Sequence, residues 1–341
     1  MGEGLAGTPG SVSVVIVAYR SGPELARCLR ALRENAPDAE VIVVDNGGAD
    51  PGEERWAGLR IVEAENNLGF AGGANLGAAQ ANGHLLVFLN QDTVAAPGAL
   101  AQLSRTAAEP GVGVVSPRLR LLDKPELLNS GGTVLHVSGI AWAGRYGEPA
   151  ESLRAVEDVA GPTGAALTIR RELFQELGGF TAELFMYLED LELGWNARLR
   201  GLRVVVDPGA DVYHDYEFSR NADKLALLER NRLVFVLSAY SPRLLVLLAP
   251  LLAGVELAMV ALALRQGWLR GKLGGWWWCM RRAPWLVRHR RETQRLRLVR
   301  DRELARLLTP VLDPKMLPLP RGTGTANRVF SAYWSLVRKA L

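Results

Sequence analysis

Three carboxylates lie within four positions of the chain, in the sequence LEDLE at residues 188–192. On a helix, Glu189 and Glu192 share one face, whereas Asp190 points elsewhere. Like charges this close raise a carboxyl pKa towards that of a general base, so the cluster is a candidate catalytic site. The alternative is an acidic first helical turn, which the helix dipole favours.

Two further carboxylates and a histidine follow apolar runs. Asp45 ends the run in VVDN and could accept hydrogen bonds from a nucleotide base or a ribose, or make an Asx turn. Asp92 ends LNQD, where a carboxylate beside a diphosphate suits Mg²⁺ or Mn²⁺. Alternatively, Asp92 or Thr93 caps the next helix. His214 follows the last predicted strand and is either a metal ligand, a leaving-group contact or a structural residue.

The segment NNLGFAGGAN at 66–75 combines polar amides with glycines around one aromatic residue. Glycines let backbone N–H groups approach a phosphate or ribose closely. The segment lacks the Rossmann G-x-G-x-x-G spacing and the Gly-Lys-Ser/Thr ending of a P-loop, so it is a weak signal by itself.

These motifs lie on a chain that alternates strands and helices. β-branched apolar runs predict buried strands, and leucines at helical spacing from Leu25 to Leu32 predict a helix. Strands are expected at 11–19, 40–46, 58–65, 84–92, 111–117 and 203–214, with helices opening within 66–83 and over 189–200. Such alternation predicts an α/β fold with a mostly parallel sheet, whose ligands lie beyond the carboxyl ends of the strands. The stretch 118–160 shows no readable pattern.

Composition and charge narrow the class of protein. With 341 residues, 48% hydrophobic and 22% charged, the chain is neither disordered nor collagen-like. Two cysteines cannot form a disulfide framework, and the first apolar run is too short for a signal peptide, so we expect a cytosolic location. From Arg265 onward, 18 Lys and Arg stand against 4 Asp and Glu, whereas the preceding residues hold 22 against 32. The basic tail indicates an anionic partner, either a membrane surface or a nucleic acid.

The residues next to the tail favour a membrane. Residues 233–264 are apolar except for Arg243 and Glu256, and the 21 residues from 244 to 264 could just cross a bilayer. A crossing would place the basic tail opposite the acidic body, against the positive-inside tendency, so a bent hairpin lying in the interface is favoured. Tryptophans 276–278 among arginines fit headgroup depth. A packed helical subdomain or a subunit interface is the alternative.

The order of these motifs resembles the inverting family 2 glycosyltransferases of the GT-A fold, and among them the bacterial rhamnosyltransferase-like branch. The resemblance covers residues 11–240 and rests on VSVVIVAYRSG, VVDN, NNLGFAGGAN, LNQDT, GAALTIRRELFQELGGF and FMYLEDLELGWNARLRG. It implies a flexible 1–10, a catalytic domain at 11–232 with halves 11–117 and 118–232, and a membrane-associated helical region at 233–341.

The resemblance also implies roles for individual residues. Asp190 would be the catalytic base with Glu189 beside it, and Asp92, with His214 as a second ligand, would hold Mg²⁺ or Mn²⁺ on the diphosphate. Many relatives have Asp-x-Asp where this chain has Asn90-Gln91-Asp92, which predicts weaker metal binding. The residues expected at the nucleotide sugar are Ala18, Tyr19, Arg20, Asp45, Asn67, Gly69, Phe70, Gly72, Gly73, Asn90 and Gln91.

The implied reaction is a single in-line displacement with inversion at the anomeric carbon. The favoured donor is dTDP-L-rhamnose, with UDP-galactofuranose and UDP-N-acetylglucosamine as alternatives. The expected acceptor is a polyprenyl-diphosphate-linked saccharide used in cell-wall or surface polysaccharide, at the cytoplasmic face of the bacterial inner membrane. No nucleic acid is expected, and the tryptophan-rich helices are compatible with a homodimer. The alternatives are a sugar-nucleotide pyrophosphorylase, a non-catalytic membrane scaffold or a nucleic-acid-binding protein.

Overall fold

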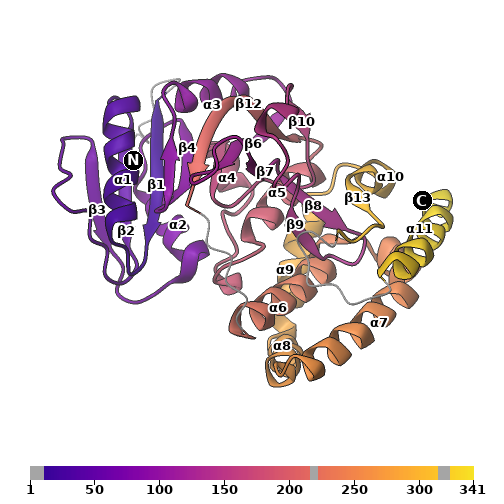
Figure 1. Cartoon of the computed structure of the whole chain (residues 1–341). Helices are drawn as coiled ribbons and strands as arrows, with labels where there is room; N and C mark the ends of the chain where they lie inside the picture. The colour runs from indigo at the N-terminus through magenta and orange to yellow at the C-terminus, as the bar shows by residue number, and fades with distance from the viewer. Residues whose placement is uncertain (1–10, 216–221, 314–322) are drawn as a thin grey trace, which may run out of the picture. The chain divides into compact units, whose positions relative to one another are not determined.

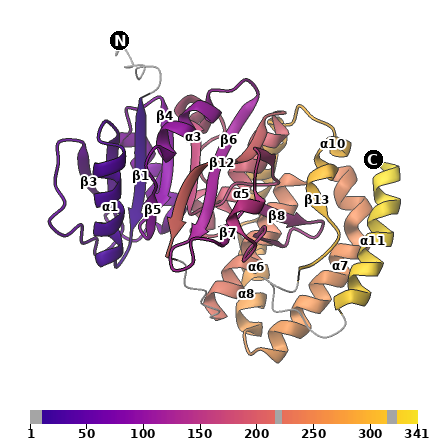
Figure 2. The ribbon, with the colours of Figure 1, turned by 45° about the horizontal axis from the view of Figure 1, so that its top comes forward.

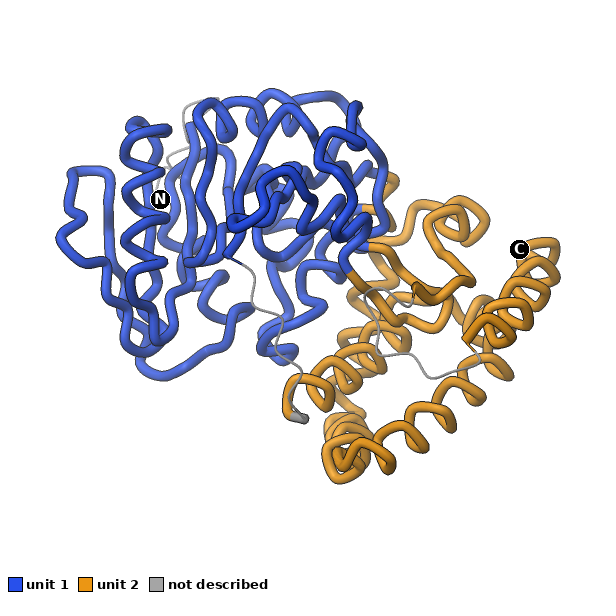
Figure 3. The backbone as a smooth tube through the Cα atoms, in the orientation of Figure 1, with its two compact units in different colours: residues 1–133, 143–197, 202–217 blue, residues 134–142, 198–201, 218–341 orange. Residues whose placement is uncertain are grey.

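The computed structural model describes residues 11–215, 222–313 and 323–341, and it divides into two compact units (Figure 3). Unit 1 comprises residues 1–133, 143–197 and 202–217, and unit 2 comprises 134–142, 198–201 and 218–341. Helix α6 (Ala222–Ala239), which contains the boundary expected at 232/233, belongs to unit 2.

Unit 1 is built on a ten-stranded sheet in the order β10-β12-β6-β11-β4-β1-β2-β3, with β5 on β12 and β7 on β6 (Figure 1). The strands β4, β1, β2 and β3 pair in parallel, and β11 runs antiparallel between β4 and β6. The strand bounds are β1 Val12–Ala18, β2 Glu40–Asp45, β3 Leu59–Glu63, β4 Leu85–Asn90, β5 Thr93–Ala95, β6 Val112–Leu121, β7 Leu128–Ser130, β10 Glu157–Asp158, β11 Ala166–Arg170 and β12 Arg203–His214. The predicted α/β class with a mostly parallel sheet is confirmed.

Helices α1 (Pro23–Asn35) and α2 (Gly69–Gln80) cover opposite faces of this sheet. Alternate residues of a strand point to opposite faces. Val14 and Ile16 of β1 share a buried apolar cluster with the inner face of α1. On the other face, α2 packs through glycines: a Cβ on Gly77 would lie 2.4 Å from Val15. Small residues at 73, 74, 77 and 78 therefore let α2 lie close to the sheet.

The remaining helices of unit 1 follow β5 in the chain. They are α3 Ala99–Ala107, η1 Ala150–Ser152, α4 Arg171–Glu176, η2 Ala182–Leu184 and α5 Glu189–Leu199, whose last residues fall in unit 2. Figure 2 shows α1 and α3 beside the sheet. The unreadable stretch 118–160 holds the end of β6 and a series of elements of two to four residues, which are too short for a periodic pattern.

Unit 2 combines helices with a small sheet in the order β13-β8-β9, from β8 (Thr133–His136), β9 (Ala141–Ala143) and β13 (Leu308–Thr309). The Val137 N–H donates to the Thr309 carbonyl at 3.0 Å, and Leu135 and Val137 are fully buried. The other helices are α7 Pro242–Arg265, α8 Leu269–Arg281, α9 Ala283–Arg295, α10 Asp301–Leu304, η3 Ala305–Leu307 and α11 Thr323–Ala340.

The apolar run at 233–264 is divided between the end of α6 and α7, a single helix that contains Pro250 and has Ser241 as its N-cap. Among the described residues, α7 is the one helix long and apolar enough to cross a membrane. Of its most apolar 18-residue stretch, 22% is buried. Helix α6 ends before residues 240–241, and residues 266–268 separate α7 from α8.

Candidate active site

A cavity of about 330 Å³ lies in unit 1, beyond the carboxyl ends of β1, β2 and β4. This is the position at which parallel α/β sheets bind ligands. The lining residues are Val17, Tyr19, Asn46, Asn67, Gly69, Phe70, Asn90, Gln91, Asp92, Phe185 and Met186. Seven of the predicted residues are therefore brought together here: Tyr19, Asn67, Gly69, Phe70, Asn90, Gln91 and Asp92.

Asn46, which follows β2, shapes one wall of the cavity. It is buried, its Nδ2 donates to Asn67 Oδ1 at 2.9 Å and to the Gly69 carbonyl at 3.1 Å, and its Oδ1 accepts from the Leu68 N–H at 2.8 Å. One amide side chain thus fixes the backbone that enters α2. The sequence motif VVDN contains this residue, but nothing in its type marks it out from the adjacent Asp45.

Gly69 meets Phe185 on the cavity wall. Gly69 has a φ of +69°, and a Cβ built on it would lie 2.3 Å from the Phe185 carbonyl oxygen. That carbonyl also accepts from the Ala71 N–H at 3.0 Å. Phe185, Tyr187 and Leu188 have φ values of 67°, 71° and 68°, so a left-handed backbone leads into α5. Such conformations cost about 1–3 kcal/mol each and cluster at functional sites.

We expect Gly69→Ala to weaken binding of the nucleotide sugar that the motifs predict by at least tenfold, because Phe185 must move out of the cavity wall to admit the new methyl group. Gly98→Ala is the matched control: Gly98 has a φ of +76°, but its Cβ would meet nothing within 4 Å. Both substitutions place an alanine at a positive φ and therefore carry the same kind of backbone strain. Only Gly69→Ala also disturbs the cavity. Calorimetric titration with the donor, beside thermal unfolding, checks this; equal affinities for the two variants would contradict it.

Gln91 holds the loop that follows β1. Its Oε1 accepts from the Tyr19 N–H at 2.8 Å, and its Nε2 donates to the Tyr19 carbonyl at 3.3 Å. Arg20, with a φ of +47°, lies over the Tyr19 ring at 5.1 Å and is exposed. Gln91 therefore positions Tyr19 at the cavity edge.

Other residues expected at the nucleotide sugar lie outside the cavity lining. Ala18 is fully buried in the core. Asp45 Oδ1 accepts from the N–H groups of Gly47 and Ala49, so the Asx-turn alternative holds for that oxygen. A Cβ on Gly72 would lie 2.9 Å from Leu68, and one on Gly73 would lie 2.8 Å from Val17. Close packing accounts for these two glycines.

Asp92 and His214 lie together, with Asp92 Oδ1 3.3 Å from His214 Nε2. The other ring nitrogen, Nδ1, lies 3.0 Å from Asn129 Oδ1, which can only accept, so Nδ1 carries a proton. Asp92 Oδ1 is buried and has no hydrogen-bond partner among the described residues. The alternative role of Asp92 or Thr93 as a helix cap is wrong, because α3 begins at Ala99 after Gly98.

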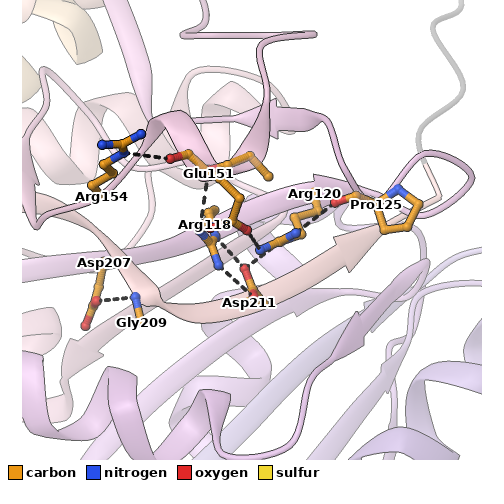
Figure 4. Close-up of polar contacts among 9 residues, drawn as sticks. Arg118, Arg120, Pro125, Glu151, Arg154, Asp207, Gly209 and Asp211 are labelled. Carbon is orange, nitrogen blue, oxygen red and sulfur yellow. Dashed lines mark hydrogen bonds and ion pairs between the residues drawn. The ribbon is translucent and has the colours of Figure 1, made fainter.

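The position of His214 follows from strand pairing. His214 pairs with Thr93 of β5 and with Leu121 of β6. Figure 4 shows the ion pairs that hold this end of β12: Asp211 Oδ1 accepts from Arg118 Nε at 2.6 Å and from Arg120 Nε at 2.8 Å. Although burial opposes it, these two guanidinium groups hold the pKa of Asp211 below its usual range.

The Asp92–His214 pair fits a divalent cation. A carboxylate oxygen facing an imidazole nitrogen needs either a proton or a cation between them, and a metal-ligating histidine characteristically donates its other N–H to an oxygen, as His214 does to Asn129. Within the described ranges there is no group of three or more His, Cys, Asp or Glu residues that could hold a metal. Two protein ligands leave positions for phosphate oxygens and water, as Mg²⁺ prefers.

Asp190 is the second residue of α5. Its Oδ1 accepts from the Leu191 N–H at 2.7 Å, and the Gly164 N–H also donates to the carboxylate. Desolvation of this partly buried carboxyl group raises the pKa of Asp190 to about 6 despite these hydrogen bonds. Burial, together with the charges of Asp190 and Glu192, raises the pKa of Glu189 well above its usual range.

Glu189 and Glu192 are buried, whereas Asp190 is partly exposed, so the predicted division of the cluster between two faces is confirmed. Asp190 lies outside the cavity lining but close to β4: a Cβ on Gly164 would lie 3.0 Å from Asp190 Oδ2, and the next residue, Ala165, accepts from the Asn90 N–H at 2.9 Å. A carboxylate with a pKa near 6 is suited to accept a proton at neutral pH.

A mostly parallel sheet with this cavity, an acidic residue at the end of β4 and a base-like carboxylate on α5 defines a GT-A-type domain. Residues 13–178 match the model of the family described as glycosyl transferase family 2. For this part of the chain, the match confirms the resemblance expected from the motifs.

Individual relatives agree with this assignment. The chain is 31% identical to the O-antigen biosynthesis protein RfbC of Myxococcus xanthus over 64% of its length, but it spans only 18% of that protein. It is 27% identical to the N-acetylglucosaminyl-diphospho-decaprenol L-rhamnosyltransferase of Mycobacterium tuberculosis, over 67% of this chain and 84% of the relative. The crystal structure of GalNAc-T7 with UDP, GalNAc and Mn²⁺ shares the fold, with a TM-score of 0.55 and 19% identity over 67% of this chain and 48% of that one.

Proposed function

We propose that the chain is an inverting, metal-dependent glycosyltransferase that moves a sugar from a nucleotide sugar to a lipid-linked saccharide. The observation that carries this proposal is the cavity beyond the carboxyl ends of β1, β2 and β4, with Asp92 and His214 in contact on one side. Asp190, with its raised pKa, adjoins the same strand end through Gly164 and Ala165.

Some residues of the cavity contact the donor, and others hold the surrounding backbone in place. Asn67, Gly69 and Phe70 offer polar and aromatic contacts to the nucleotide or sugar, while Asn46 and Gln91 hold the surrounding backbone in place. Asp92 and His214 would hold Mg²⁺ or Mn²⁺. When bound, such a cation neutralises the negative charge that develops on the departing diphosphate.

Asp190 accepts the proton of the acceptor hydroxyl as that oxygen attacks the anomeric carbon. A single displacement from the face opposite the leaving group inverts the anomeric configuration. A positioned general base contributes about 10²–10⁴-fold to the rate. Glu189, whose pKa is raised chiefly by burial, adjoins Asp190, and a negative charge on it would raise the pKa of Asp190 further.

The relatives guide the choice of substrates. The mycobacterial relative is named as a rhamnosyltransferase acting on a decaprenol-linked N-acetylglucosaminyl diphosphate, which supports dTDP-L-rhamnose as donor and a polyprenyl-diphosphate-linked saccharide as acceptor. The O-antigen relative supports a role in surface polysaccharide. A lipid-linked acceptor requires a site at the membrane, and we place the protein at the cytoplasmic face of the bacterial inner membrane.

The test is release of nucleoside diphosphate from a panel of nucleotide sugars: dTDP-L-rhamnose, UDP-galactofuranose and UDP-N-acetylglucosamine. Each reaction contains the full chain in detergent, a lipid-linked saccharide acceptor and Mg²⁺, Mn²⁺ or EDTA. We expect release from one donor that requires both acceptor and metal, with dTDP-L-rhamnose as that donor.

The possible results separate the parts of this proposal. Release that persists in EDTA would remove the metal role, and release from a UDP sugar alone would replace rhamnose. An intact donor in every reaction, together with no donor binding by calorimetry, would overturn the transferase proposal. Pyrophosphate as the product would instead indicate a pyrophosphorylase.

A further inference from the structure

Helix α7 exposes a continuous apolar stripe, which we call the outer stripe: Val246, Ala249, Pro250, Ala253, Gly254, Leu257, Ala258, Ala261 and Leu264. The large members Val246, Leu257 and Leu264 are 74%, 72% and 67% exposed. The buried residues Leu244, Leu248, Leu251 and Val255 recur every three or four positions on the opposite face. The outer stripe is about 27 Å long, and so large an apolar face marks an interaction site.

A buried ion cluster fixes which face of α7 points outward. Glu256 is the one acidic residue of α7, and its Oε2 lies 2.8 Å from Lys272 Nζ and 2.9 Å from Trp276 Nε1, while its Oε1 pairs with Arg232. Glu229 completes the cluster, 2.6 Å from Lys272 Nζ and 2.8 Å from Arg232 Nε. Because two cations and two anions compensate one another here, turning α7 about its axis would leave charges buried and unpaired.

The same cluster argues against a membrane crossing. Glu256 lies near the middle of α7, so a crossing helix would carry the four charges towards the centre of the bilayer, together with α6 and α8. Helix α8 has 13 residues, about 20 Å, which is shorter than a hydrocarbon core of about 30 Å. A helix lying in the plane of the interface keeps the cluster inside unit 2 and places the outer stripe among acyl chains.

Basic and aromatic side chains beside the outer stripe indicate which kind of surface α7 would contact. Helix α8 exposes Leu273, Trp277 and Met280, and the Arg281 guanidinium lies 5.0 Å from the centre of the Trp277 ring. Arg243 and Arg265 stand at the two ends of α7. Tryptophan and arginine at the border of an apolar face match the headgroup region, and the excess of basic residues from Arg265 onward matches anionic lipid.

We propose that unit 2 docks on an anionic bilayer surface through the outer stripe of α7 and the Leu273–Trp277–Met280 edge of α8, without crossing the membrane. This docking surface does not depend on the transferase reaction. It holds the chain at the membrane whichever donor is used.

The first test is flotation of the full chain with vesicles of phosphatidylcholine, alone or mixed with phosphatidylglycerol. We expect co-flotation with the anionic vesicles, and at least a tenfold loss of the bound fraction in Leu257→Glu/Leu264→Glu. The matched control is Leu298→Glu/Val311→Glu, because both residues are exposed in unit 2 outside α7 and α8. It carries the same added charge and is expected to float like the unchanged protein. Thermal unfolding verifies that both variants are folded.

The second test reports the orientation of α7 in cells. Arg243→Cys and Arg265→Cys place a thiol at either end of α7, in a Cys279→Ala background where buried Cys28 is the other thiol. For a helix in the plane of the cytoplasmic face, a membrane-impermeant maleimide labels both ends in inverted vesicles and neither in intact spheroplasts. One end labelled in each preparation would mean that α7 crosses the membrane.

Three other results would overturn the docking surface. They are equal flotation with neutral and anionic vesicles, equal loss in the control variant, and unchanged flotation of Leu257→Glu/Leu264→Glu accompanied by dissociation of a dimer. The last result would assign the outer stripe to a second copy of the chain.

Discussion

Asp190→Asn is expected to lower kcat by about 10²–10⁴-fold while leaving the affinity for the nucleotide sugar nearly unchanged. The amide keeps the size and the hydrogen bond from the Leu191 N–H, but it cannot accept the proton of the acceptor hydroxyl. Single-turnover transfer and calorimetric donor binding measure the two quantities separately. Exposed Glu34→Gln on α1 is the control for loss of a carboxylate elsewhere in unit 1. Near-normal transfer by Asp190→Asn would remove Asp190 from the reaction.

The pH dependence supplies a second readout for Asp190. Because the base must be ionised, kcat/KM of the unchanged protein should fall about tenfold per pH unit below pH 6. The folded pKa lies above the unfolded value of about 3.9, so the stabilising contribution of protonation is present below pH 4 and is lost as pH rises through 6. Asp190→Asn should therefore unfold about 2–4 °C higher than the unchanged protein at pH 8. A lower unfolding temperature would mean that the charged carboxylate stabilises the fold.

Asp92→Asn is expected to lower kcat/KM by about 10²–10³-fold and to abolish the effect of EDTA on donor binding. In the unchanged protein we expect the cation and the diphosphate to bind cooperatively, because their opposite charges attract each other, so EDTA should weaken donor affinity. Calorimetric titration of donor with Mn²⁺ and with EDTA measures this coupling directly.

Asp38→Asn, an exposed change in the same unit, should keep the full EDTA effect. If Asp92→Asn retained the coupling between metal and donor, the cation would be held elsewhere. His214→Ala should show a smaller loss of coupling, since Asp92 then keeps one charged ligand.

The first half of the sheet was readable because its signals are local. The runs Val12–Ala18 and Glu40–Asp45 are mostly apolar and β-branched, and the spacing of Leu25, Cys28, Leu29 and Leu32 defines one face of α1. The stretch 118–160 shows no readable pattern because its strands are short, and because β8 and β10 pair with the distant strands β13 and β12.

Candidate site residues can be named from the sequence where the chemistry resides in residue type, but not where the site depends on backbone conformation or on contacts between distant segments. Residue type singles out Asp92 and His214, and the family resemblance places both at one cation. Their contact arises from pairing of β12 with β5 and β6, which no local pattern shows. Phe185 and Met186 line the cavity in a segment with positive φ at Phe185, Tyr187 and Leu188, which their residue types do not signal. Glu256 looked like an interruption of an apolar run, whereas the fold pairs it with Lys272 and Arg232.

The pairing of β13 with β8 has a consequence for synthesis of the chain on the ribosome. Residues 134–142 belong to unit 2, but Leu308 and Thr309, which complete their sheet, are made about 170 residues later. Until then, Leu135 and Val137 lack their final cover and the outer edge of β8 has unpaired backbone groups. Non-local closure of this kind slows folding and leaves an interval open to aggregation. The nascent protein therefore has most need of a chaperone, or of the membrane itself, in the interval between the emergence of β8 and that of β13.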